Sequence, residues 1–221
     1  MLRVRSITPI DVPADELARR QQRYDRLSPP GITVMLDNIG EGAPRSLDTA
    51  ADIRASDERV TRLARATDPR RFDVVVPDCV LDPGVEADAP VPVAGILRLA
   101  AGHCAAFGLP FGSVTRNPAI GEELERRLRQ YGLDRRYTGN DVLALDFDAI
   151  ADDARWGGAV AGARDRLAER GAVAVLNGCS AVDLGDDASV GPVVLDPTRL
   201  ALALLAAGAQ AGLDLGARVR A

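Results

Sequence analysis

The chain of 221 residues has no lysine, a single histidine and three cysteines, and all 27 of its basic residues are arginine. Without lysine, Schiff-base chemistry and lysine-based cofactor chemistry are excluded. The one histidine, His103, falls inside a predicted helix, so a Ser-His-Asp triad or a Cys-His pair is hard to build. No Cys-x-x-Cys or His-x-x-x-His spacing is present, and we expect no metal site.

Further motifs and charge patterns that are missing from the sequence restrict the kinds of molecule the protein can bind. Neither Gly-x-Gly-x-x-Gly nor a phosphate-binding P-loop motif follows the first predicted strand, so we expect no cofactor. The net charge is −5 and no basic stripe appears, which argues against nucleic acid. No apolar run is long enough for a membrane span, and the N-terminus lacks a signal-peptide core. We therefore expect a cytoplasmic protein with reduced thiols, acting on a small molecule through thiol, carboxylate, hydroxyl and backbone amide groups.

Strand-like and helix-like segments alternate along the chain, which predicts an α/β fold with parallel strands and right-handed crossovers. Strands are predicted at residues 2–8, 32–37, 73–77, 91–94, 111–115, 141–146, 172–177 and 192–195. Helices are predicted at about 13–27, 48–67, 95–107, 119–131, 158–170 and 198–213.

The strand signals recur in the same order in both halves, which predicts two similar lobes. For example, Val91-Pro92-Val93 and Gly191-Pro192-Val193 lie a hundred positions apart. We predict two Rossmann- or flavodoxin-like lobes, each with a roughly four-stranded, mostly parallel sheet, related by a pseudo-twofold axis with the active site in the cleft between them. Residues 1–95 with 198–221 would form lobe one, with the last helix packing back on it, and 96–197 would form lobe two.

Two cysteines, Cys79 and Cys179, occupy the same local context a hundred positions apart. Each ends a short apolar run typical of a buried parallel strand, and ligands bind at the carboxyl ends of such strands. Two thiols at equivalent positions can face each other across one substrate, so that a proton leaves one face of a carbon and returns to the other. Cys104 lies on an alanine-rich helix face and is predicted to be a packing residue.

Proton removal next to a carbonyl builds negative charge on oxygen and requires hydrogen-bond donors. Both cysteines lie in strand-to-helix turns, where amide groups and the helix dipole favour thiolate. No lysine or histidine is near either one in sequence, so the backbone must supply most of that help. Candidate donors to the enolate are Thr8, Ser113, Thr115 and Ser180. Asp37, Asn38 and Asn117 follow strands and can orient an amide or amine, and Pro9, Ser46, Val80 and Gly178 complete the predicted substrate-binding set.

The segment Asp78-Cys79-Val-Leu-Asp82-Pro83-Gly84, followed by Val91-Pro92-Val93-Ala-Gly95, resembles the hydantoin (allantoin) racemase branch of the aspartate/glutamate racemase superfamily. Further similar motifs are Gly42-Ala-Pro44-Arg-Ser46, Ser113-Val-Thr115, Tyr131-Gly132-Leu133 and Asn177-Gly178-Cys179-Ser180. The resemblance covers nearly the whole chain. It implies that Cys79 and Cys179 act as acid and base on opposite faces of a stereocentre, without a metal or organic cofactor, in a homo-oligomer.

One motif departs from the branch: the first loop reads Thr8-Pro9-Ile10-Asp11, where the branch has Asn-Pro-Asn-Thr to hold the substrate's polar edge. The leading hypothesis is a cofactor-independent racemase or epimerase, an isomerase acting on a hydantoin, an amino acid or a related cyclic amide. One alternative is a maleate-type cis–trans isomerase or a decarboxylase of the same superfamily. Another is a two-lobed protein that only binds a small ligand.

Overall fold

The computed structural model describes residues 1–184 and 191–213, and strands and helices alternate along them. The strands are β1 (Leu2–Ile7), β2 (Ile32–Asp37), β3 (Val74–Pro77), β4 (Phe111–Thr115), β5 (Tyr137–Val142), β6 (Ala174–Asn177) and β7 (Val193–Leu195). The helices are α1 (Ala14–Leu27), α2 (Ala50–Arg65), α3 (Ile96–Ala106), α4 (Pro118–Tyr131), α5 (Asp153–Glu169) and α6 (Pro197–Gln210), with 3₁₀ turns η1 (Asp134–Arg136) and η2 (Phe147–Ala151).

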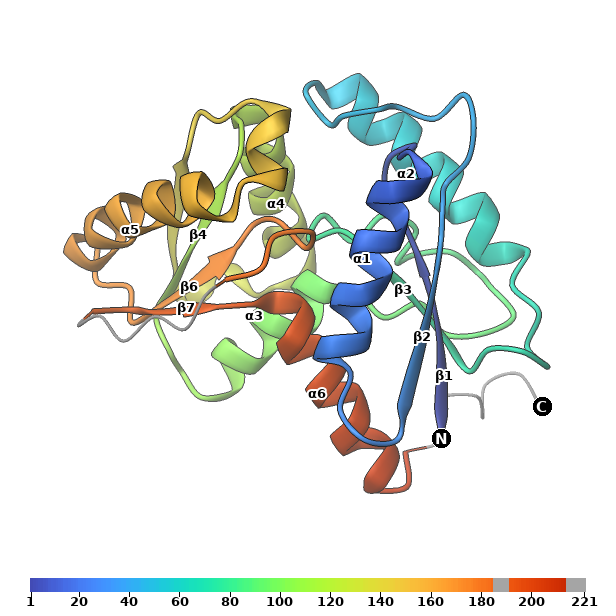
Figure 1. Cartoon of the computed structure of the whole chain (residues 1–221). Coiled ribbons are helices and arrows are strands. Elements are labelled where there is room, and N and C mark those ends of the chain that lie inside the picture. The colour runs from blue at the N-terminus through green and yellow to red at the C-terminus, as the bar shows by residue number, and fades with distance from the viewer. Residues whose placement is uncertain (185–190, 214–221) are drawn as a thin grey trace.

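The strands form two separate parallel sheets, one in each half of the chain (Figure 1). The first has the order β2-β1-β3 and the second has the order β5-β4-β6-β7. The strand predicted at 91–94 is present only as one isolated parallel bridge, from Val93 to Val75. That bridge lies beside β3 as β7 lies beside β6, so the two halves share one topology. The predicted α/β fold with two similar lobes is confirmed.

The central strands are short apolar runs buried along their whole length. All four residues of β3 and all four of β6 are buried, as parallel strands covered on both faces require. In Figure 1, α2 flanks the first sheet and α5 flanks the second, with α1, α3 and α6 between the two sheets. The carboxyl ends of β3 and β6 therefore lead into the region between the halves.

The second strand of the second half lies earlier in the chain than the sequence predicts. The predicted range was 141–146, whereas β5 covers Tyr137–Val142. The register between β4 and β5 shifts near the start, where Gly139 has a φ of 110°. Ala144, with a φ of 52°, then leaves the extended conformation, although the Leu143 N–H still bonds the Thr115 carbonyl. The apolar run Val142-Leu-Ala-Leu145 continues past the point where the strand ends, and this explains the error.

Helix α6 packs against α3 and also touches α1. The division into 1–95 with 198–221 and 96–197 stays a prediction, and its last residues, 214–221, lie outside the described residues. Among the helices described, none combines the length and the apolar character needed to cross a membrane.

Candidate active site

Both predicted catalytic cysteines open onto one cavity of about 60 Å³ between the two halves. Cys79 is buried and Cys179 is half-buried. The cavity is lined by both cysteine turns (residues 78–81 and 178–181), Pro9, Ile10, Arg20, Leu47, Arg116, Ile120, Phe147 and Ile150. Apart from Arg20 and Arg116, the side chains that line the cavity outside the cysteine turns are apolar, so the two cysteines border a largely apolar space.

The two cysteine turns have the same internal geometry. Cys79 follows β3 and Cys179 follows β6, each at the second position beyond the strand. The Leu81 N–H lies 3.4 Å from the Cys79 sulfur, and the Ala181 N–H bonds the Cys179 sulfur. In both turns the donor belongs to the residue two positions after the cysteine. A backbone N–H in this position stabilises a thiolate, so either sulfur can carry the negative charge.

A hydrogen bond joins the two turns directly. The Ser180 hydroxyl donates to the backbone carbonyl of Asp78 at 2.8 Å, across 102 positions of sequence. These two residues are the immediate neighbours of Cys179 and Cys79. The relative position of the two sulfurs is therefore fixed by a contact between the lobes.

The Cys179 turn is held by buried groups of the second half. The Asn177 side chain donates to the Cys179 carbonyl at 2.9 Å, and its oxygen accepts the indole N–H of Trp156, on α5, at 3.0 Å. Gly178 lies so close to β4 that a Cβ there would stand 2.1 Å from the Val114 carbonyl oxygen. The sequence motif gives no sign of the Trp156 contact.

Hydrogen bonds to the Asp82 side chain hold the Cys79 turn in place, whereas the sequence pattern indicates only a turn at this residue. Asp82 has a φ of 50°, and its carboxylate accepts the backbone N–H groups of Leu97 and Arg98, both at 2.9 Å. It therefore caps α3, whose N-cap residue, Gly95, has no side chain to do so. The Tyr131 hydroxyl also donates to Asp82, at 3.1 Å. Burial raises the pKa of Asp82 to about 6.

Arg20, on α1, is a site residue that the sequence reasoning missed. Its guanidinium is buried on the cavity wall, where it bonds Glu16 at 2.6 Å and Asp78 at 3.1 Å. Asp78 in turn accepts the Tyr24 hydroxyl at 2.9 Å. A positive charge therefore borders the cavity beside the cysteines. It belongs to a helix that is distant from both cysteines in sequence, so the backbone is not the only source of thiolate stabilisation.

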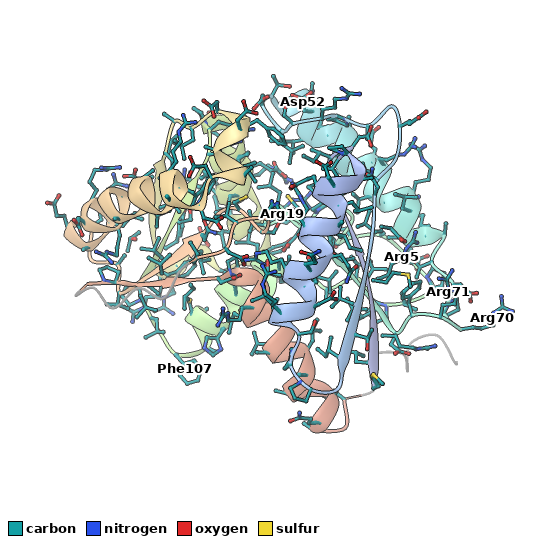
Figure 2. All side chains as sticks on the ribbon, viewed as in Figure 1. Arg5, Arg19, Asp52, Arg70, Arg71 and Phe107 are labelled. Carbon is teal, nitrogen blue, oxygen red and sulfur yellow. The ribbon has the colours of Figure 1, made fainter. Side chains whose placement is uncertain are left out.

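The sequence did contain one signal for this contact, the arginine cluster on α1. Arg19, Arg20, Arg23 and Arg26 follow helical spacing. Arg19 donates to the Ala181 carbonyl at 3.0 Å and Arg23 donates to the Val182 carbonyl at 2.8 Å. Figure 2 shows Arg19 on the side of α1 that faces the second half. Such a cluster usually forms a solvated helix face, but Arg20 and Arg23 are both buried.

Arg116, directly after β4, is the second missed cation. Its guanidinium bonds Asp48 at 2.5 Å and the Leu47 carbonyl at 3.3 Å. It also lies 5.8 Å from the centre of the Phe147 ring. Arg116 therefore links the loop before α2 to η2, and all three segments border the cavity.

The electrostatic surroundings of the two thiols differ. Burial is the largest influence on both and raises the pKa of each. At Cys79 the carboxylates of Asp78 and Asp82 raise the pKa further. At Cys179 the guanidinium of Arg20 and, more weakly, that of Arg23 lower it, in opposition to Asp78. The positive charge thus acts on one side of the pair.

Four of the predicted substrate-binding residues line the cavity: Pro9, Val80, Gly178 and Ser180. The others lie outside its lining. Thr8 is buried, donates to the Ile10 carbonyl at 2.8 Å and accepts the Ile39 N–H at 2.9 Å. Its hydroxyl shapes the first loop, which presents Pro9 and Ile10 to the cavity.

The remaining predicted residues bond neighbouring protein groups. Asp37 pairs with Arg5 at 2.7 Å, Asn38 donates to the Val12 carbonyl at 2.8 Å, and Ser46 bonds Asp48. Ser113 lies 2.6 Å from the Tyr137 hydroxyl, and Thr115 accepts from Asn140 at 2.8 Å. Asn117 caps α4 by accepting the Ile120 N–H at 2.9 Å and donates to the Leu47 carbonyl at 2.9 Å. Most of these contacts hold the loops that surround the cavity.

Within residues 1–184 and 191–213, no group of three or more His, Cys, Asp or Glu side chains could hold a metal ion.

Comparison with known proteins decides the family. The profile of the Asp/Glu/hydantoin racemase family matches residues 16–205, which include both cysteine turns and most of the cavity. The chain belongs to this family. As a member of the racemase family it is an isomerase, and the predicted enzyme class is confirmed. No sequence among the curated proteins matches the chain.

Solved structures of racemases share the fold. The chain resembles allantoin racemase from Pseudomonas fluorescens, with a TM-score of 0.79, 18% identity and coverage of 97% of this chain and 93% of that one. Allantoin racemase from Klebsiella pneumoniae gives a TM-score of 0.76 at 20% identity, with 97% and 90% covered. Unliganded arylmalonate decarboxylase gives a TM-score of 0.56 at 18% identity, with 94% and 93% covered. The predicted resemblance to the aspartate/glutamate/hydantoin racemases is confirmed at the level of the family, and the two allantoin racemases share the fold of this chain.

Proposed function

We propose that this racemase-family protein is a cofactor-independent racemase or epimerase that uses Cys79 and Cys179 as acid and base on opposite faces of a carbon acid. The observation that carries the proposal is the junction of the two cysteine turns. Both sulfurs border one cavity, and the Ser180–Asp78 hydrogen bond holds their turns together. In the proposed arrangement, a small substrate in that cavity has one sulfur on each side.

In this mechanism one sulfur starts as thiolate and the other as thiol. The thiolate takes the proton from the stereocentre, and the electron pair of the C–H bond moves onto the neighbouring carbonyl. The second thiol then gives its proton to the opposite face of the carbon, and the electron pair returns. One proton is removed and one is added, so the substrate is inverted and the two sulfurs exchange roles.

The cavity wall supports this chemistry by excluding water. Ile10, Leu47, Ile120, Phe147 and Ile150 surround the space with apolar surface, and charge interactions are stronger where water is absent. The N–H groups of Leu81 and Ala181 stabilise whichever sulfur is charged. The same amides require no reorganisation when the charge moves from one sulfur to the other.

The substrate class we propose is a hydantoin, an amino acid or a related cyclic amide. The two allantoin racemases support a hydantoin-like ring. The first loop favours a ring with a less polar edge than hydantoin itself, because Ile10 lines the cavity at a position where the hydantoin branch has asparagine. A substrate that directs an apolar substituent toward Pro9 and Ile10 fits this wall.

Solvent deuterium incorporation tests the proposal. A panel of single-enantiomer hydantoins and amino acids is incubated with the protein in deuterium oxide, and optical rotation and mass are followed together. We expect one substrate class to lose rotation and gain one deuterium at the stereocentre. Cys79→Ser and Cys179→Ser should each slow racemisation at least about 10³-fold, since loss of a general acid or base typically costs ~10²–10⁴-fold.

The control is Cys104→Ser, because Cys104 is buried in α3 away from the cavity lining. It should keep turnover if the variant folds. Full activity in both site variants would rule out the two-thiol mechanism.

A second candidate, decarboxylation of a malonate, is supported by the structural likeness to arylmalonate decarboxylase. That reaction needs a proton delivered to one face only, so loss of one sulfur would matter and loss of the other would not. Carbon dioxide release from an arylmalonate, measured in Cys79→Ser and Cys179→Ser, separates the two candidates. Equal dependence on both sulfurs favours racemisation.

The homo-oligomeric state and the cytoplasmic location also remain proposals. Both follow from the resemblance and the composition described above. Light scattering of the purified protein measures the oligomeric state, and a mass of one chain at working concentration would contradict the first.

A further inference from the structure

Arg20 reaches the site from α1 and is held at both ends of its guanidinium. One end bonds Glu16, four residues earlier on the same helix, at 2.6 Å. The other end bonds Asp78, which precedes Cys79 and accepts the Ser180 hydroxyl through its carbonyl, at 3.1 Å. The Arg20 side chain is 4% exposed, so it has one fixed position and little screening by water.

We propose that Arg20 sets the resting charge of the cysteine pair, so that in the free protein Cys179 is the thiolate and Cys79 the thiol. The inference rests on the proposed function and goes beyond it by assigning Arg20 as a positioning residue and breaking the symmetry of the two sulfurs. The local sequence supplies only part of this difference: Asp78 and Asp82 flank Cys79, whereas the cations that act on Cys179 come from α1.

The position of α1 carries the argument, together with the charged groups around each sulfur. Arg19 and Arg23, on the same helix as Arg20, donate to the Ala181 and Val182 carbonyls just after Cys179 at 3.0 and 2.8 Å. Arg20 itself lines the cavity that both cysteines border. Cys179 is acted on by Arg20 and Arg23 from α1, by Asp78 from the turn after β3 and by the Cys79 sulfur. Two of these are cations, and the Ala181 N–H adds a donor.

Cys79 has the opposite surroundings. It is acted on by the carboxylates of Asp78 and Asp82 and by the Cys179 sulfur, with the Leu81 N–H as the opposing group. The remaining cation on the cavity wall, Arg116, is bonded to Asp48 at 2.5 Å. The backbone donors are equivalent in the two turns, so the side-chain charges decide which sulfur holds the proton.

Racemisation has an equilibrium constant of one, which fixes how this asymmetry can be detected. The value of kcat/KM must be equal for the two enantiomers whatever the resting state, so turnover alone does not reveal it. The protonation state of each sulfur in the free protein does. Alkylation reports it directly, because only the thiolate reacts.

The experiment is substoichiometric labelling with iodoacetamide from pH 6 to pH 10, with each labelled peptide quantified by mass spectrometry. The midpoint of the pH profile is compared, because accessibility changes the rate at a plateau but not the midpoint. We expect Cys179 to be labelled with a lower midpoint than Cys79. Arg20→Gln should raise the Cys179 midpoint by about 1 pH unit or more, as expected for loss of a close opposite charge.

Glu16→Gln gives the opposite shift and protects the test against misfolding of the Arg20 variant. Removing this carboxylate leaves the Arg20 charge less compensated, so the Cys179 midpoint should fall. Arg20→Lys should restore most of the wild-type midpoint. Arg26→Gln is the matched control, because Arg26 is an exposed arginine on the same helix that pairs with Asp183, and it should leave both midpoints unchanged.

A lower midpoint for Cys79 than for Cys179 in the wild type would overturn the assignment. So would a Cys179 midpoint that does not move in Glu16→Gln and Arg20→Gln. These outcomes are independent of turnover. The two-thiol mechanism is judged separately, from the activity of Cys79→Ser and Cys179→Ser.

Discussion

The Ser180 hydroxyl donates to the Asp78 carbonyl at 2.8 Å, and this bond connects the residue after one cysteine to the residue before the other. The two residues lie in different halves of the chain, and each follows a strand of a different sheet. The contact thus joins the two equivalent turns of the sequence repeat, and both turns line one cavity.

Ser180→Ala tests this junction. The variant removes one buried hydrogen bond, which should lower the free energy of unfolding by about 1 kcal/mol. Small displacements of reacting groups can lower the reaction rate ~10²-fold. We therefore expect kcat to fall by more than the loss of folded protein alone would cause. Urea unfolding and optical rotation assays measure the two effects.

The matched control for that prediction is Ser28→Ala. Ser28 makes the same kind of bond, from its hydroxyl to the Tyr24 carbonyl at 2.7 Å, at the end of α1. A similar loss of stability with unchanged kcat is expected there. An equal fall in kcat in both variants would show that the Ser180 contact has no special role.

Asn177→Asp tests the support of the Cys179 turn. The change keeps an acceptor for Trp156 but places a carboxylate oxygen opposite the Cys179 carbonyl oxygen, where an N–H donor stood. Loss of that bond and the new repulsion should cost about 1–3 kcal/mol at pH 8. The cost should shrink toward pH 5, because a protonated carboxyl can donate again. Urea unfolding at the two pH values measures it.

Asn140→Asp is the comparison for this change. Asn140 donates to the Thr115 hydroxyl at 2.8 Å, and a hydroxyl can rotate to donate to a carboxylate, whereas a carbonyl cannot. The free energy of unfolding should therefore fall less in Asn140→Asp than in Asn177→Asp. Equal losses at both positions would contradict the role assigned to Asn177.

Gly178→Ala tests the close approach of the second cysteine turn to β4. The added Cβ would stand 2.1 Å from the Val114 carbonyl oxygen, a backbone atom that cannot move aside alone. Overpacking of this kind should lower the free energy of unfolding by about 1–3 kcal/mol and displace Cys179. Gly158→Ala, in α5 with no atom within 4 Å of its Cβ, should instead stabilise by roughly 0.5–1 kcal/mol. Thermal and urea unfolding with activity assays compare the pair.

Asp82 predicts a pH dependence of stability. Its pKa is about 6 in the folded protein and 3.8 ordinarily, chiefly because of burial. The protonated form is therefore favoured by folding, so the contribution is complete below the ordinary pKa and is lost as pH rises through about 6. Relative to Asp82→Asn, which does not titrate, the wild type should lose roughly 3 kcal/mol between about pH 4 and pH 7. Urea unfolding across this range measures it, and a constant difference would contradict the prediction.

The sequence predicts best what depends on local pattern. Cys79 and Cys179 were found because each follows a buried strand whose apolar run is visible in the sequence, and equivalent strand ends meet at equivalent places. The strand predicted at 141–146 lies too late in the chain, because the continuous apolar run after Asp141 does not reveal the turn at Ala144. The strand at 91–94 was reduced to the Val93 bridge for a similar reason, since four apolar residues do not ensure a continuous ladder.

Contacts between the halves were beyond prediction. Arg20 lies in an arginine cluster on a polar helix, but the cluster alone does not show that this side of α1 faces the turn after β6. Thr8 and Ser113 show the converse limit. Both follow or lie in strands near the site, as predicted, yet their hydroxyls bond the Ile10 carbonyl and Asn140. Side-chain direction depends on packing that a strand pattern does not encode.

The chain has only one tryptophan, and its indole N–H bonds the asparagine that holds the Cys179 carbonyl. Trp156 is thus a natural fluorophore connected to the Cys179 turn by two consecutive hydrogen bonds. Any rearrangement of that turn as the cavity fills reaches the indole, and its emission can be recorded in the unlabelled protein without interference from a second tryptophan.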